Sequence, residues 1–253
     1  MNKSETYRQK LAAIQDWEPY LLQESGLPGP RGNLELAQVV ADLGDRGLFE
    51  RFLAYTPELA PVNDPHEFLA FCGVVGLGRL LAEGDEQLLE QIRPYARDPR
   101  WRMREGVAMA LQRLGRTDMP RLLTAMERWM ESWMEGSSSA NWLEKRAVAA
   151  ALAEPVLLHN PQDARHALRI LDRITSSMEN SAEAKTEEFK VLQQGLGYCW
   201  SVVVVAAPEP GQRLMEKWLA CPDPAIRRLM QENLKKNRLV RMDPAWVEKW
   251  RKK

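Results

Sequence analysis

Residues 98–115 read Asp-Pro-Arg-Trp-Arg-Met-Arg-Glu-Gly-Val-Ala-Met-Ala-Leu-Gln-Arg-Leu-Gly. Asp98 is a residue type that caps helices, and Pro99 suits a first helical turn. Apolar residues then recur at the spacing of one helical face: Met103, Val107, Ala110, Leu111 and Leu114. Gly115 stands where a left-handed cap would end a helix. The stretch therefore predicts an amphipathic helix that buries Leu111.

Helical spacing of apolar residues continues through the 253-residue chain, without sustained strand alternation. The helix-ending residues Gly44, Gly84, Gly115, Pro155 and Pro208 are 40, 31, 40 and 53 residues apart. A period near ~40 residues is typical of arrays of stacked helical hairpins. The run 202–205 is four valines, which favour strands in isolation, but its helical context predicts a helix. The sequence predicts an all-α protein of about six helical hairpins.

The order of residues in 98–115 resembles the second helix of a HEAT repeat: Asp-Pro, an apolar residue before Arg, then Ala-Leu and Leu-Gly. Residues 221–227 repeat part of this order, with Ile226-Arg227 matching Met103-Arg104 and Leu234 matching Leu111. The resemblance implies a right-handed, armadillo-like α-solenoid that forms a single HEAT-like repeat domain over 1–253. In such arrays Arg104 and Arg227 would pair with an acid at a neighbouring turn. The alternative is contact with phosphate through the fork of guanidinium donors.

Charge is unevenly distributed, although the net charge is zero. Residues 1–90 carry 7 basic and 15 acidic groups, whereas residues 213–253 carry 12 and 5, a net of +7. This basic C-terminal end is either a site for an anionic partner or a solvated helical end. The residues expected to bind there are Arg228, Lys235, Lys236 and Arg238. A second basic cluster is Arg97, Arg100, Arg102 and Arg104, and the last three are further binding candidates.

Residues 141–147, Asn-Trp-Leu-Glu-Lys-Arg-Ala, resemble the Trp and Arg helix start of the HEAT-like alkylpurine DNA glycosylases. The resemblance implies a basic concave groove for DNA, with Arg146 as its arginine. The Trp-x-x-x-Asp pairing expected in that family is absent, because Glu105 stands four residues after Trp101. No catalytic residue is therefore carried over.

Other site classes find no support in the sequence. The three cysteines and three histidines form no Cys-x-x-Cys or His-Glu-x-x-His motif, so neither a metal site nor a disulfide framework is predicted. The fragments Gly76-Leu77-Gly78 and Gly195-Leu196-Gly197 lie inside apolar helical periods and indicate close helix packing, not phosphate loops. Most tryptophans are expected in the core, including Trp101. No signal-peptide core or membrane span is predicted, and reduced thiols favour a cytoplasmic protein.

The long loops are expected within hairpins, at 26–32, 57–63, 136–141 and 176–186. In a solenoid they share one edge, which often marks the binding face. The sequence leaves enzymatic activity undecided and favours a non-catalytic scaffold. Its concave face would hold a protein or an anionic partner, without a cofactor or a membrane. The alternative is a DNA-binding protein related to the glycosylases, whose partner is nucleic acid.

Overall fold

The computed structural model describes residues 2–135 and 141–252. It contains 15 α-helices and two short 3-10 helices in these residues, is 75% helical, and has no strand in the part described. The prediction of an all-α protein is confirmed, and the four valines at 202–205 are helical. No helix within these ranges is long and apolar enough to cross a membrane.

Contacts divide the chain into two compact units, residues 1–117 and 118–253, which we call the N-terminal and C-terminal units. Each has its own buried core. The expectation of one continuous repeat domain over 1–253 stays a prediction.

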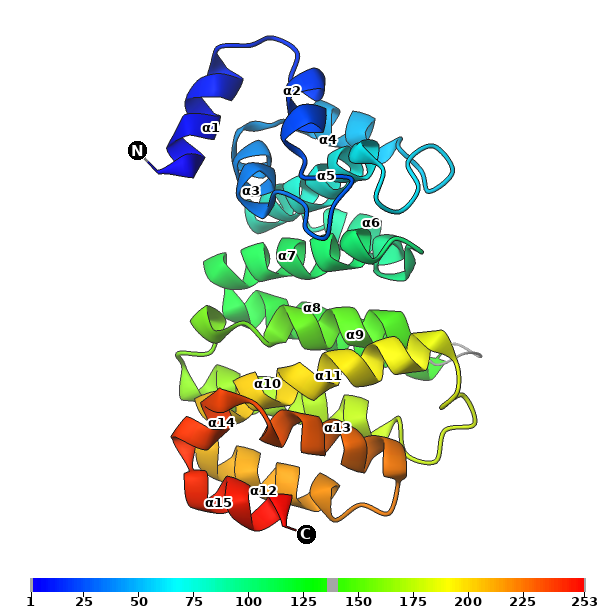
Figure 1. The fold of residues 1–253 in the computed structure, drawn as a ribbon, viewed down its shortest axis with the longest axis vertical. Coiled ribbons are helices and arrows are strands. Elements are labelled where there is room, and N and C mark those ends of the chain that lie inside the picture. Colours follow the sequence, from blue (N-terminus) through cyan, green and yellow to red (C-terminus); the bar gives the residue numbers. More distant parts are fainter. Residues whose placement is uncertain (1, 136–140, 253) are drawn as a thin grey trace. The chain divides into compact units, whose positions relative to one another are not determined.

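The N-terminal unit is built around α5 (Pro65–Ala82), which packs against α3, α4 and α7 (Figure 1). Helix α5 is buried along most of its length, because apolar residues surround it on all sides. The other helices of this unit are α1 (Lys3–Ala12), α2 (Glu18–Glu24), α3 (Leu34–Leu43), α4 (Arg46–Leu53), α6 (Leu88–Ile92) and α7 (Trp101–Thr117), with a 3-10 turn at Arg93–Arg97.

The C-terminal unit is built around α11 (Glu187–Ala206), which lies between α9 and α13 (Figure 1). Helices α8, α10 and α12 form a second row, in which α10 contacts both of the others. The remaining bounds are α8 (Met119–Glu135), α9 (Trp142–Leu152), α10 (Pro161–Ser176), α12 (Pro208–Leu219), α13 (Pro224–Leu234), α14 (Asn237–Met242) and α15 (Pro244–Arg251), with a 3-10 turn at Pro155–Leu157.

Two glycines inside α5 permit the closest helix contacts of the N-terminal unit. A Cβ added at Gly78 would lie 2.3 Å from the Cα of Ala110, and one at Gly76 would lie 2.3 Å from a ring carbon of Phe49. Both distances are far below van der Waals contact. The interpretation of Gly76-Leu77-Gly78 as a packing feature is therefore confirmed.

Three local predictions are wrong. Helix α7 does not end at Gly115, which is helical and buried; the helix continues to Thr117. It also begins at Trp101, not at Pro99. Trp101 is not a core residue, because 42% of it is exposed. The late start of α7 follows from the bonds between Asp98 and Arg100, which occupy the turn before the helix.

Candidate functional site

Arg100 is a buried, fully bonded side chain. Asp98 Oδ1 accepts from its backbone N–H at 2.8 Å and from Nε at 2.9 Å, and Asp98 Oδ2 accepts from Nη2 at 2.8 Å. Nη1 donates to the carbonyls of Tyr55 and Ala60 at 2.8 and 3.1 Å. Buried charges are tolerated in proteins when they are paired and hydrogen-bonded in this way. The guanidinium of Arg100 is therefore part of the fold.

Arg102 forms a second buried ion pair. Its Nη1 donates to Glu67 Oε2 at 3.0 Å, and Glu67 is completely buried. Its Nη2 donates to the carbonyl of Gly29 at 2.7 Å and to Asn63 Oδ1 at 3.3 Å. Asn63 Oδ1 also accepts from the N–H of Gly29 at 2.9 Å. Arg102 thus ties the loop at 26–32 to the loop that ends at Asn63.

The two predicted loops of the N-terminal unit therefore contact each other, whereas a single edge shared by all four long loops stays a prediction. The loop at 136–141 falls almost entirely outside the described residues. Arg100 and Arg102, proposed from the sequence as binding residues, have internal partners instead. The bidentate geometry that makes Arg suitable for phosphate also suits Asp98 and backbone carbonyls.

Arg104 and Arg146 are half-buried. Arg104 Nη1 donates to the carbonyls of Asp98 and Pro99 at 2.7 and 3.1 Å, so it supports the start of α7. The stem of Arg146 lies against Gly195 of α11, where an added Cβ would be 3.2 Å from Arg146 Cγ. Neither residue lines the open pocket at the end of α13.

The remaining candidates gather in the C-terminal unit. Lys235, Lys236 and Arg238 line one open pocket of about 740 Å³, together with Arg241 and the apolar Val205. We call it the basic pocket. It is formed where α13 ends, where α14 begins and where α11 comes to its last turn. Arg228 is exposed on α13 but does not line the pocket.

Buried polar bonds hold this corner together. Asn233 of α13 is completely buried; its Oδ1 accepts from the N–H of Ser201 at 2.8 Å, and its Nδ2 donates to the carbonyl of Leu196 at 2.9 Å. Both partners lie on α11. Because Asn233 fixes α13 against α11 two residues before Lys235, the cations that follow are held at a defined place.

The four cations differ in how far they are engaged. Lys235 pairs with Glu232 at 2.5 Å on the surface, and its hydrogen bond lowers the pKa of that carboxyl. Arg238 Nη2 donates to the hydroxyl of Tyr198 at 2.7 Å, and the guanidinium carbon of Arg238 lies 4.6 Å from the centre of the Tyr198 ring. Exposed pairs contribute little to stability. Lys236 and Arg241 have no ion pair within the described residues and are the freest donors.

Sequence reasoning missed Arg241, Tyr198 and Val205. Arg241 lies three residues after Arg238, so both can share one face of α14. Tyr198 and Val205 are seven residues apart on α11 and both are exposed. The spacing of these residues could have marked them, but only the contact of α14 with α11 shows which face they line.

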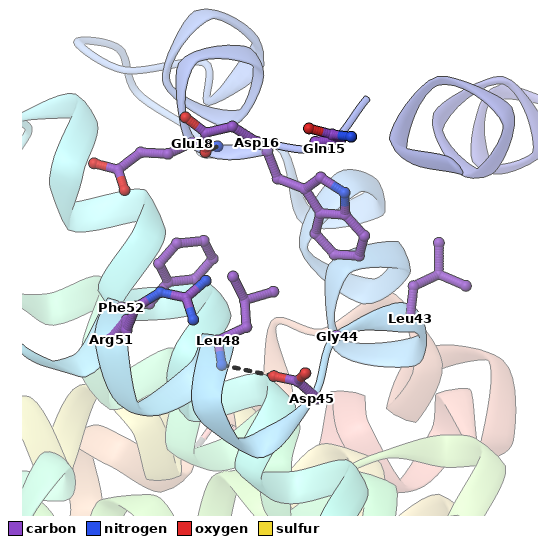
Figure 2. A pocket seen from close by; sticks show the side chains of 10 residues that line it. Gln15, Asp16, Glu18, Leu43, Gly44, Asp45, Leu48, Arg51 and Phe52 are labelled. Carbon is purple, nitrogen blue, oxygen red and sulfur yellow. Dashed lines mark hydrogen bonds between the residues drawn. The ribbon is translucent and has the colours of Figure 1, made fainter. Parts of the chain in front are cut away.

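A smaller pocket of about 300 Å³ lies in the N-terminal unit, between residues 15–18 and the start of α4 (Figure 2). Its carboxylates serve the backbone and neighbouring side chains. Asp16 Oδ1 accepts from the N–H of Glu18, Asp45 Oδ1 caps α4 through the N–H of Leu48, and Glu18 accepts from the hydroxyl of Tyr55. That last bond raises the pKa of Tyr55 to about 12. These hydrogen bonds give Asp16, Asp45 and Glu18 structural roles in the fold.

Lys145 of α9 is buried between two tryptophans. Its Nζ lies 4.3 Å from the ring centre of Trp142 and 5.6 Å from that of Trp133, and it donates to Ser177 Oγ at 3.0 Å. Burial lowers the pKa of this amine to about 8, although Glu183 opposes the shift. The tryptophan faces stabilise the charged form in place of a bonded carboxylate.

Comparison with protein-family models, curated proteins and solved structures finds no match to this chain. No group of three or more His, Cys, Asp or Glu residues in the described ranges could hold a metal ion. The basic pocket is therefore judged on its own chemistry. Four cations around an open hollow can bind an anion by charge and hydrogen bonds.

Proposed function

We propose that the chain is a non-catalytic binding protein of HEAT-like helical repeats, and that it holds an anionic partner at the basic pocket. The observation that carries the proposal is the convergence of Lys235, Lys236, Arg238 and Arg241 on one hollow. Of the four, only Lys235 forms an ion pair in the described part of the chain. The partner is an anionic polymer, such as nucleic acid or an acidic protein segment.

The HEAT-like part of the proposal is supported by the packing of alternate helices. In the C-terminal unit, α9, α11 and α13 are successive neighbours, while α8, α10 and α12 are neighbours in the other row. Each helical hairpin thus contacts the next one along the chain, which is the arrangement of repeat proteins. We propose that this arrangement continues as a right-handed solenoid with a concave binding face. We also propose a cytoplasmic location, which fits the three buried free thiols.

The related glycosylase function receives less support. Trp142, in the tract that resembles that family, is buried, and Arg146 beside it packs along α11. Had Trp142 and Arg146 both been exposed, this tract would have favoured DNA repair. We therefore propose DNA only as one possible anionic polymer.

The test uses Lys236→Glu/Arg241→Glu, measured by fluorescence anisotropy with a labelled short duplex DNA and with a labelled acidic peptide at low salt. We expect the wild type to bind at least one probe, and the variant to bind it about tenfold or more weakly. For DNA, log affinity falls by about 0.9 per unit of log salt for each phosphate neutralised, so the variant's salt dependence should be shallower by about two units.

The matched control is Arg165→Glu/Arg169→Glu, which makes the same change in charge with two exposed arginines of α10. It should retain most of the affinity, because α10 does not line the basic pocket. Equal losses in both variants would mean that net charge alone attracts the probe. A wild type that binds neither probe would overturn the proposal.

A further inference from the structure

A second pocket lies in the N-terminal unit, apart from the basic pocket in sequence and in chemistry. It has a volume of about 340 Å³ and its exposed lining is mostly apolar. Trp101, Glu105 and Met109 are four residues apart on α7, so they form one face of that helix. Phe71 of α5 and Leu34 of α3 complete the apolar wall. We call this the tryptophan pocket.

Two of these apolar side chains are exposed. Trp101 is 42% exposed and Leu34 is 52% exposed. Trp101 is held in place by Arg102, whose guanidinium carbon lies 4.5 Å from its ring centre. One face of the indole is thus fixed by a cation. Exposed apolar residues gathered around a concave pocket mark binding sites more often than scattered ones do.

The rim of the tryptophan pocket is preorganised. Pro30, Arg31 and Gly32 form it, and the loop that carries them is tied down by the bond from Arg102 to the carbonyl of Gly29. Gly26, with φ +76°, opens this loop; an added Cβ there would lie 2.7 Å from the carbonyl oxygen of Arg31. A site held by a buried ion pair requires little ordering when a ligand binds.

The charge at the rim selects the ligand. Arg31 is exposed and has no hydrogen bond or ion pair in the part of the chain described. Arg102 also lines the pocket, but Glu67 neutralises it. Glu105 is the single acid of the lining. With the Arg102–Glu67 pair set aside, Arg31 and Glu105 balance in charge, so the preference for an anion rests on the exposed guanidinium of Arg31. An anionic group is therefore favoured beside Arg31, with an apolar body against Trp101.

We propose that the tryptophan pocket binds a small organic anion with a flat apolar body, such as an aromatic carboxylate. The ring system lies against Trp101, Phe71 and Met109, and the carboxylate accepts hydrogen bonds from Arg31. The volume is at the lower end for ligand pockets, which suits one or two fused rings. This site does not depend on the function proposed for the basic pocket.

The test uses three matched probes in calorimetric titrations with the full chain: 2-naphthoate, the neutral 2-naphthalenemethanol and the cationic 2-naphthylmethylamine. We expect naphthoate to bind most tightly, with one site per chain. Arg31→Gln should weaken naphthoate about five- to tenfold, because a charge-assisted hydrogen bond is lost, and leave the neutral probe unchanged. Trp101→Ala should weaken both, because the shared apolar contact is lost.

Arg51→Gln is the matched control, since Arg51 is another exposed arginine of this unit without an ion pair in the described residues. It should leave naphthoate binding intact, and circular dichroism should show the same helix content in all three variants. Absence of naphthoate binding to the wild type would overturn the proposal, and so would tighter binding of the cationic probe. Self-association abolished by Trp101→Ala would show instead that a second chain covers the pocket. DNA and peptide binding should be unchanged in Arg31→Gln, which separates this result from the fate of the basic pocket.

Discussion

Of the four Asp-Pro sequences in the chain, the two that belong to the HEAT-like copies, at 98–99 and 223–224, begin helices in different ways. Asp223 caps α13 directly: its Oδ1 accepts from the N–H groups of Ala225 and Ile226 at 2.8 and 3.2 Å, and Pro224 is the first helical residue. Asp98 instead binds Arg100, and α7 starts three residues after it. The residue after proline is Arg in one copy and Ala in the other.

This difference shows how one side chain changes the use of a shared motif. With Ala225, the carboxylate has only backbone donors within reach and becomes an ordinary cap. With Arg100, it becomes half of a buried ion pair that also ties the chain at Tyr55 and Ala60. The two copies should therefore respond very differently to the same substitutions.

The largest effect is expected for Asp98→Ala. It leaves Arg100 buried with carbonyl acceptors but without a counter-charge, which costs about 3–5 kcal/mol. Urea denaturation followed by circular dichroism measures the loss. Asp98→Asn loses the acceptor of Nη2 but keeps one oxygen for the backbone N–H and Nε of Arg100, and should lose less. A loss below about 1 kcal/mol for Asp98→Ala would contradict the buried pair.

The next effect should be the same in both copies. Leu111 and Leu234 occupy matching positions and neither is exposed. Leu111→Ala and Leu234→Ala should each cost about 2–5 kcal/mol, because each leaves a cavity in a packed core. Equal denaturation midpoints for Leu111→Ala and the wild type would show that the helix face is misplaced. A large difference between the stability losses of Leu111→Ala and Leu234→Ala would argue against the matching of residues 98–115 with residues 221–234.

A smaller effect is expected for Asp223→Ala. Loss of a helix cap costs about 1 kcal/mol, and Asp223 also accepts from the N–H of Asn180 at 2.9 Å. The same denaturation experiment measures it, with Asp223→Asn as the control that retains a capping oxygen. A cost as large as that of Asp98→Ala would remove the distinction between the copies.

The smallest effect concerns Arg227, which the HEAT resemblance pairs with an acid. Arg227 is exposed and has no ion pair within the described residues. Arg227→Ala should change stability by less than about 0.5 kcal/mol, as is usual for surface positions. Arg104→Ala is the comparison, since Arg104 bonds two carbonyls and should cost more. Equal losses of stability in Arg227→Ala and Arg104→Ala would indicate that the two arginines play the same structural role, as the HEAT resemblance implies.

The sequence predicted helices well where apolar spacing is regular, as from Met103 to Leu114. It failed at Gly115, because a glycine can serve as a packing residue inside a helix as well as an end. It also failed to distinguish buried from exposed arginines. Arg102 reaches Glu67 and Gly29, which are 35 and 73 residues away, and no local pattern reports such contacts.

The candidate site was predictable in part. Lys235, Lys236 and Arg238 stand together in the sequence, and the structure places all three in the basic pocket. Tyr198 and Val205 could be found only once α14 was seen to contact α11. The tryptophan pocket was hidden because Trp101 was expected in the core.

The burial of Lys145 makes the stability of the folded chain depend on the protonation of this amine. With a folded pKa of about 8, below the ordinary value of 10.5, the amine loses its proton in the folded chain while the unfolded chain still holds one. Its contribution to the free energy of unfolding therefore rises as pH increases from about 8 towards 10.5. Lys145→Met should abolish that rise, which shows in the difference between the two pH profiles.

The protonation state of Lys145 should also change the fluorescence of the neighbouring tryptophans. Trp133 and Trp142 both face the amine, and removal of its charge changes the electric field at their rings. Tryptophan emission of the folded protein should accordingly titrate with a midpoint near pH 8, and the transition should vanish in Lys145→Met. Emission that is flat between pH 7 and 9 would mean that the amine keeps its charge there. Lys145, which is bonded to no carboxylate within the described residues, would thus report its own protonation through tryptophan emission.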